Sequence, residues 1–176
     1  MKSGVSYLGV ARVTEGIDLR KTGFSVPILL FEIIPPEYVE QGVVYSLDMT
    51  VCTLEEAKRI ESVAERVKRK ARIHVKIDTG MGRLGYNWKG AAEFVEQVAR
   101  MRWLDIAAIY SHFATSEGPD QTFAKEQLAR FTAVLAETEK LRIEIPLKHM
   151  ANTGAIMSLP ESHFDLVRPG FMMYGC

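Results

Sequence analysis

Short apolar, β-branched runs alternate along this chain with longer stretches of helical period, and that alternation restricts the possible fold more than any other feature. Such a rhythm predicts repeated β-α units around a parallel sheet. Strands are expected at Tyr7–Val13, Ile28–Phe31, Met49–Val51, Ile73–Ile77, Ile106–Ser111 and Leu147–Met150, with Leu166 and Val167 marking a seventh. About seven β-α steps suit either a doubly wound sheet or most of an eight-stranded barrel, and periodicity does not separate the two.

Three stretches between the expected strands have helical period: Leu54–Lys70, Lys89–Met101 and Asp120–Lys140. The first follows Thr53, and Glu56 stands three positions on, as a capping box requires. The other two carry apolar stripes, which are expected to pack on the sheet.

The composition sets broad limits on partners and location. The chain has 176 residues, 47% of them hydrophobic, so one domain with one core is expected. Its 22 basic residues balance 22 acidic residues, which gives no reason to expect nucleic acid or an anionic membrane as a partner. Cys52 and Cys176 form no paired motif, and no ligand cluster with suitable spacing points to a metal. Residues 1–13 lack a signal peptide and no stretch has the length of a membrane span, so a cytoplasmic protein is expected.

The strongest motif runs from Ile73 through Asp78-Thr-Gly-Met-Gly-Arg-Leu-Gly85, from an expected strand into a loop with three glycines. Strand alternation places Lys76 and Asp78 on one face. In a barrel this face would point inwards near the carboxyl ends of the strands, where β-α loops build active sites. Inward charges are costly without a polar task, which favours a ligand site. The alternative is an ion pair of Asp78 with Arg83 that stabilises the loop.

The segment 78–85 resembles a signature of alanine racemases. Further segments agree with that family in order: Gly9–Gly16 with Leu19-Arg20, Ser111–Ala114 before Asp120, Met150–Asn152, and Val167–Gly170 ending in Tyr174-Gly175. The resemblance implies an α/β fold, namely an incomplete TIM-type (β/α)8 barrel that lacks its first strand and the C-terminal β domain. Residues 1–176 would then be a partial barrel domain that binds pyridoxal 5'-phosphate, starting within the first helix and stopping after the last strand.

The resemblance also implies roles for residues at the ring of the cofactor. Arg168 would face the pyridine nitrogen and leave it unprotonated, because arginine does not readily give up a proton. The alternative is that Arg168-Pro-Gly is an ordinary turn. Arg83 would hydrogen-bond the ring oxygen. His112 would lie against the ring, unless it is an ordinary core histidine. No function is expected for His74, His149 or His163.

Lys76 and Asp78 would support this site. Some family members carry a carboxylated lysine at the position that matches Lys76, and a plain pair of Lys76 with Asp78 is the competing interpretation.

The phosphate end would be held by the Thr153 hydroxyl and the backbone amides of Gly170 and Phe171, with Asn152 beside them. The family more often has serine after the asparagine, but threonine retains the donor. As an alternative, Asn152 and Thr153 cap the helical turn that follows.

Two acid-base groups are needed for racemisation, and in the family they are a Schiff-base lysine on the first strand and a tyrosine of the second domain, contributed across a dimer. No residue of this chain takes either role, so no catalytic residue is assigned. The resemblance implies that the parent enzyme is a homodimeric isomerase that interconverts L- and D-alanine for peptidoglycan precursors. A noncatalytic cofactor-binding module, a truncated fragment and a racemase for another amino acid such as serine are the alternatives.

Overall fold

The computed structural model describes residues 4–175, which fall into two compact units. The first unit contains the chain up to His74 together with Val98–Ala107, and the second contains Val75–Gln97 and the chain from Ala108 onward. Strands β4 and β6 contribute their first halves to one unit and their second halves to the other.

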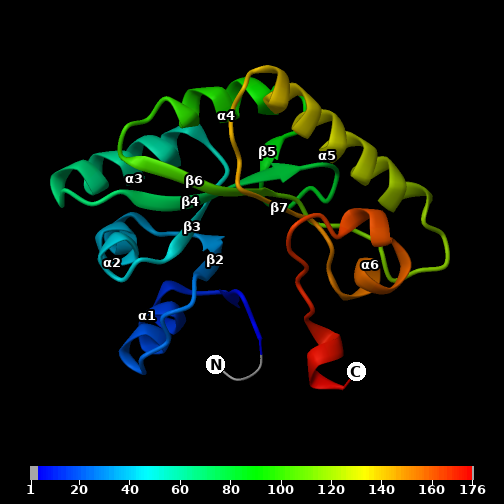
Figure 1. The fold of residues 1–176 in the computed structure, drawn as a ribbon, viewed down its shortest axis with the longest axis horizontal. Helices are drawn as coiled ribbons and strands as arrows, with labels where there is room; N and C mark the ends of the chain where they lie inside the picture. Colours follow the sequence, from blue (N-terminus) through cyan, green and yellow to red (C-terminus); the bar gives the residue numbers. More distant parts are fainter. Residues whose placement is uncertain (1–3, 176) are drawn as a thin grey trace. The chain divides into compact units, whose positions relative to one another are not determined.

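The described residues form seven strands: β1 Leu8–Val10, β2 Ile28–Ile33, β3 Asp48–Val51, β4 Ala71–Asp78, β5 Tyr86–Asn87, β6 Leu104–Tyr110 and β7 Leu147–His149. In the first unit the neighbours follow the order β1-β2-β3-β4-β6. In the second unit β4 lies between β5 and β6, and β6 pairs in parallel with β7 (Figure 1). Apart from the two-residue β5, each strand pairs with the next along the chain. The order does not reverse as it does in a doubly wound sheet, so it is the order of a (β/α)8 barrel.

Residues 4–175 also contain six α-helices and three short 3-10 helices: α1 Val13–Lys21, η1 Pro36–Tyr38, α2 Val39–Val44, α3 Leu54–Arg66, α4 Ala91–Ala99, α5 Thr122–Lys140, α6 Thr153–Ser158, η2 Pro160–Ser162 and η3 Phe171–Tyr174. The last three follow β7. In the second unit α4 and α5 lie on the same side of the strands (Figure 1). The predicted capping box of α3 is confirmed, since Thr53 Oγ1 accepts from the Glu56 amide at 3.2 Å and Glu56 Oε2 accepts from the Thr53 amide at 3.1 Å. No helix within residues 4–175 is long and apolar enough to cross a membrane.

The expected strand Tyr7–Val13 is wrong in its second half, because β1 ends at Val10 and α1 begins at Val13. The cause is the carboxylate of Glu15, whose Oε2 accepts from the amides of Ala11 and Arg12 at 2.9 and 2.8 Å and so caps the helix that follows.

Two further differences concern the seventh strand and the start of the chain. Leu166 makes only an isolated bridge with His149, and the seventh strand is instead the short β5. The expected helix at the start of the chain falls partly on residues 1–3, which lie outside the described residues, and residues 4–7 form no helix.

A polar cluster lies at the amino ends of β3 and β4 in the first unit. The buried Asp48 carboxylate accepts from Tyr7 Oη at 2.6 Å and from Arg72 Nε at 3.0 Å, and it lies 3.3 Å from His74 Nε2. Burial acts to raise the pKa of Asp48, but the hydrogen bonds with His74, Arg72 and Tyr7 outweigh it and lower that pKa. The side chains of this cluster hydrogen-bond one another, and the cluster lies away from the carboxyl ends of the strands.

Candidate functional site

The carboxyl ends of β6 and β7 bring aromatic and polar side chains together in the second unit. The parallel register pairs Tyr110 with His149, and their rings stack with centroids 4.6 Å apart and planes 5° apart. Ser111 and His112 follow directly after β6. This end of parallel strands is where barrels of this type build their active sites.

Arg168 is the centre of the cluster. Its Nη1 donates to His149 Nδ1 at 2.6 Å, and its Nη2 donates to the carbonyl oxygens of Ser111 at 2.8 Å and Met150 at 3.0 Å. The same Nη2 lies 3.1 Å from His112 Nδ1. One guanidinium therefore joins the ends of both strands, in the bidentate manner that arginine permits and lysine does not.

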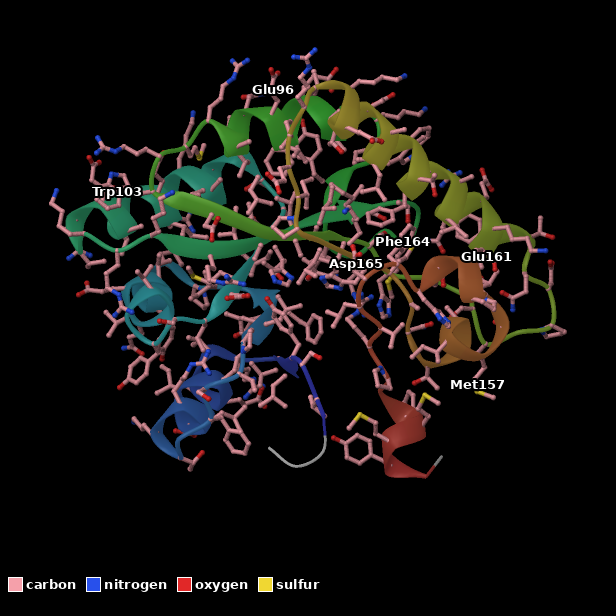
Figure 2. All side chains as sticks on the ribbon, in the orientation of Figure 1. Glu96, Trp103, Met157, Glu161, Phe164 and Asp165 are labelled. Carbon is pink, nitrogen blue, oxygen red and sulfur yellow. The ribbon has the colours of Figure 1, made fainter. Side chains whose placement is uncertain are left out.

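The main chain around Arg168 explains why its side chain reaches that position. The amide of Arg168 donates to the Ala151 carbonyl at 3.0 Å. Two hydrogen bonds join Asp165 to Lys148 of β7. The Asp165 amide donates to the Lys148 carbonyl at 3.0 Å, and the Lys148 amide donates to Asp165 Oδ2 at 2.8 Å. Phe164, labelled with Asp165 in Figure 2, packs edge-on against Phe131 of α5 with ring centroids 5.4 Å apart. These contacts hold the segment along β7 as far as Arg168.

The contacts of Arg168 determine the protonation of both histidines. A guanidinium only donates, so His149 must accept at Nδ1 and carry its proton on Nε2. A proton on His112 Nδ1 is disfavoured as well, because it would point at the N–H groups of Arg168 Nη2. Burial, and then the positive charges of Arg168, Lys76 and Arg83, lower the pKa of His112 to about 3. His112 is therefore neutral at physiological pH. Burial lowers the pKa of Arg168 to about 10, which leaves it protonated at that pH.

Lys76 lies buried on β4 beside the same cluster. Its Nζ is 5.3 Å from the centre of the Tyr110 ring, and the guanidinium carbon of Arg168 is 5.5 Å from that centre. Both cations therefore interact with one aromatic ring.

Thr153 and Gly170, the two residues predicted for the phosphate end, lie in contact with each other. The Gly170 amide donates to Thr153 Oγ1 at 3.0 Å. Phe171 follows at the start of η3, with its side chain 75% exposed. The Thr153 hydroxyl at the first residue of α6 thus accepts from the Gly170 amide and keeps its own proton, which is a suitable donor to an anion.

Asn152 caps α6. Its Oδ1 accepts from the Ala155 amide at 3.1 Å and from Ser116 Oγ at 2.6 Å, and its Nδ2 donates to Glu117 Oε1 at 2.8 Å. The capping alternative is therefore confirmed for Asn152.

The glycine loop after β4 is held by Asp78 without an ion pair to Arg83. Asp78 Oδ1 accepts from the amides of Gly80 at 2.9 Å and Gly82 at 3.1 Å. Gly85 has a φ of +133°, and a Cβ there would lie 2.5 Å from the amide nitrogen of Asp78. Arg83 is exposed on this loop, and its charge is one of those that lower the pKa of His112.

The structure thus brings Arg168 together with His112, places Lys76 beside them, and joins Thr153 to Gly170. Sequence reasoning did not include Tyr110 or His149, because their stacking depends on the register between β6 and β7. A histidine directly before Met150-Ala-Asn152 at a strand end was the one available signal. Within residues 4–175 no group of three histidine, cysteine or acidic side chains could hold a metal ion.

Comparison with known proteins gives a consistent result. The family description "Alanine racemase, N-terminal domain" matches residues 1–176. Alanine racemase 1 of Caldanaerobacter subterraneus subsp. tengcongensis is 42% identical over 175 residues, which are 99% of this chain and 45% of that protein. Alanine racemase of Methanococcus maripaludis is 37% identical over 176 residues, which are 99% of this chain and 47% of that protein. The chain therefore spans about half the length of the curated relatives it matches.

Solved structures agree with the sequence relatives. The alanine racemase of Clostridium difficile 630, in complex with cycloserine, superposes with a TM-score of 0.96 at 32% identity over 98% of this chain and 48% of that one. The alanine racemase of Streptomyces lavendulae has a TM-score of 0.89 at 30% identity over 99% of this chain and 46% of that one. These matches confirm the expected fold class, an incomplete TIM-type barrel, and the chain belongs to the alanine racemase N-terminal domain family.

Proposed function

We propose that the full-length protein containing this chain is a pyridoxal-phosphate-dependent isomerase that interconverts L- and D-alanine. The observation that carries the proposal is Arg168, a fixed cation whose partners are two neutral histidines and two carbonyl oxygens at the ends of β6 and β7. Family membership and the names of the relatives support the substrate and the reaction.

The donor set of the second unit fits the cofactor. Arg168 offers a guanidinium for a ring nitrogen that must accept, and the Thr153 hydroxyl, which accepts from the Gly170 amide, keeps its own proton to donate to a phosphate oxygen. The Gly170 amide would bind phosphate only by exchanging its bond to Thr153 for one to the phosphate. Arg83 and the amide of Phe171 are the further proposed donors, to the ring oxygen and the phosphate. When bound, pyridoxal phosphate supplies the electron sink that stabilises negative charge at the substrate Cα.

The residues of this chain would set how strongly that sink acts. Arg168 has a pKa of about 10, so at neutral pH it donates a hydrogen bond without transferring its proton. His149 accepts from its Nη1, and the carbonyls of Ser111 and Met150 accept from its Nη2, which keeps the guanidinium in one orientation. By leaving the ring nitrogen unprotonated, Arg168 would weaken the electron sink, and this would favour return of the proton to the substrate Cα over competing reactions.

Other parts of the proposal rest on the family alone. These are the homodimer, a cytoplasmic location, the carboxylation of Lys76, and the supply of both acid-base groups from outside this chain. The same holds for the extent of the cofactor-binding domain, residues 1–176, and for the support that Lys76 and Asp78 give to the site. Asn152 would assist the phosphate end only indirectly, through the α6 cap.

The test uses the purified full-length protein with pyridoxal phosphate. We expect interconversion of the alanine enantiomers, measured by chiral chromatography, and a slower reaction with L-serine. Arg168→Lys should weaken cofactor binding about tenfold or more, because a point charge replaces a fork with several bonds. Arg59→Lys, which changes a partly exposed arginine paired with Glu55 on α3, is the matched control. Absence of any racemase activity in the cofactor-saturated wild type would refute the proposal.

A further inference from the structure

Gln127 of α5 is a fully buried polar side chain that the proposed function does not use. Its exposed fraction is 0%, although it lies on a helix whose other face meets water. A buried amide is costly unless its hydrogen bonds are made, so its partners indicate what it does.

The amide of Gln127 holds the main chain on both sides of Phe113. Its Oε1 accepts from the Ala114 amide at 2.9 Å, and its Nε2 donates to the His112 carbonyl at 3.2 Å. The orientation of the side-chain amide follows from these partners, because a backbone N–H only donates and a carbonyl only accepts. One side chain thus fixes the segment that carries the His112 imidazole.

The second proton of Gln127 Nε2 starts a chain of hydrogen bonds with a single direction. Nε2 donates to Thr79 Oγ1 at 3.2 Å, and Thr79 Oγ1 lies 2.9 Å from Ser111 Oγ. Ser111 Oγ donates its only proton to the Ile77 carbonyl at 2.8 Å, so Thr79 must be the donor to Ser111. The chain therefore runs from α5 through the end of β4 to Ser111, whose own carbonyl accepts from Arg168.

Arg130, one turn further along α5, supports the same point. Its Nη1 donates to the Thr79 carbonyl at 2.7 Å, and its guanidinium carbon lies 5.6 Å from the Trp88 ring and 5.8 Å from the Phe123 ring. A Cβ on Gly80 would lie 2.8 Å from Arg130 Nη1, so the backbone at Gly80 packs directly against the Arg130 guanidinium. Thr79 is thus fixed from both its side chain and its main chain.

We propose that Gln127 is a positioning residue for the reaction proposed above, which sets the place of the His112 imidazole and of the Ser111 carbonyl that Arg168 binds. This inference rests on the proposed function. It follows from geometry, since the two groups that contact Arg168 from the β6 end are both held by hydrogen bonds that start at one side chain.

The experiment compares three variants of the full-length holoprotein. Gln127→Met keeps the volume and removes every hydrogen bond. Gln127→Glu keeps an acceptor for the Ala114 amide but loses the donor to the His112 carbonyl. Thr138→Val is the matched control, because Thr138 is a buried side chain of the same helix whose hydroxyl donates only to the Leu135 carbonyl at 2.8 Å.

The measurements are hydrogen exchange of the Ala114 amide, the nitrogen chemical shift of His112 Nδ1, the dissociation constant of pyridoxal phosphate, and kcat and KM for alanine. In Gln127→Met we expect Ala114 exchange and the dissociation constant to rise about tenfold, as loss of one hydrogen bond implies. We expect kcat to fall about tenfold or more, because the affected groups orient the cofactor, while KM stays within about twofold. In Gln127→Glu the Ala114 amide should stay protected while the His112 shift and kcat still change.

Wild-type values of the His112 shift and of kcat in both Gln127 variants would overturn the inference. Equal losses in Thr138→Val would also overturn it, since they would show that any weakening of α5 has the same effect. If the wild-type protein shows no racemase activity, the proposed function fails. The Ala114 exchange and the His112 shift then still decide whether Gln127 positions His112.

Discussion

At the scale of single residues, the site depends on the fact that a guanidinium only donates. Each partner of Arg168 must accept, and the two that can change their protonation are His112 and His149. Protonation of either imidazole at Nδ1 would remove an acceptor and place two positive charges in contact. The arrangement is therefore stable only where both histidines are neutral.

The first prediction concerns the pH dependence of stability. The pKa of His112 is about 3 in the folded protein and near 6.5 in the unfolded chain. Between these values the unfolded chain binds more protons, so the free energy of unfolding falls as the pH falls through this window. The slope due to His112 is at most about 1.4 kcal/mol per pH unit. Urea unfolding of wild type and His112→Gln at pH 7.5, 6.0 and 5.0 measures it. Parallel curves for the two proteins would contradict the prediction.

A second prediction concerns His149. His149→Phe keeps a ring to stack on Tyr110 but leaves Arg168 Nη1 without its acceptor. We expect the free energy of unfolding to fall by about 1–3 kcal/mol, the usual cost of a buried polar group without its partner. His163→Phe is the control, because His163 lies outside this cluster and its ring hydrogen-bonds the Ile156 carbonyl. Equal urea midpoints for wild type and His149→Phe would show that the stack, and not the acceptor, is what matters.

At the scale of elements, the loop after β4 depends on glycine at one position more than at another. Gly85 has a φ of +133° and no room for a Cβ, whereas Gly82 has a φ of +70° and nothing within 4 Å. We expect Gly85→Ala to lower the free energy of unfolding by about 3 kcal/mol or more, and Gly82→Ala by about 1–2 kcal/mol. Urea unfolding of both variants tests this difference. Equal losses would mean that the loop shifts to relieve the contact between residue 85 and Asp78.

The elements also show how far the sequence could predict the fold. Longer helices such as α3 and α5 carry their own period, and α3 also carries its own capping box. The apolar runs of β2, β4 and β6 stand out in any environment. Short elements do not: α6 contains six residues and depends on the Asn152 cap, and β5 contains two. Their existence is decided by tertiary contacts, which local propensity does not contain.

The candidate site divides in the same way. Arg168, His112, Thr153 and Gly170 could be named in advance because each stands in a motif that resembles a family segment. Tyr110 and Gln127 could not, since one depends on strand register and the other on how α5 packs. A buried glutamine in a helix reads in sequence like any exposed one, and only its partners reveal it.

At the scale of the whole molecule, the proposed function would have the chain supply donors for two ends of one cofactor but no assigned acid-base group. Cofactor binding and catalytic turnover should therefore be separable by experiment, because they depend on different residues. Nothing in the cluster around Arg168 depends on the missing roles, because every contact described there lies within the second unit. The relatives are about twice as long, which leaves room for the remaining groups elsewhere in a full-length protein.

The last prediction follows from that separation. The 176 residues expressed alone, with a folded state checked by near-ultraviolet circular dichroism, should bind pyridoxal phosphate without racemising alanine. Borohydride should not trap the cofactor on them, because Lys76 is buried under the Tyr110 ring and no other lysine is assigned to the site. The full-length protein should show both trapping and turnover. Trapping on Lys76 would instead give this chain a covalent anchor of its own, and turnover by the chain alone would require acid-base groups among residues to which we assign none.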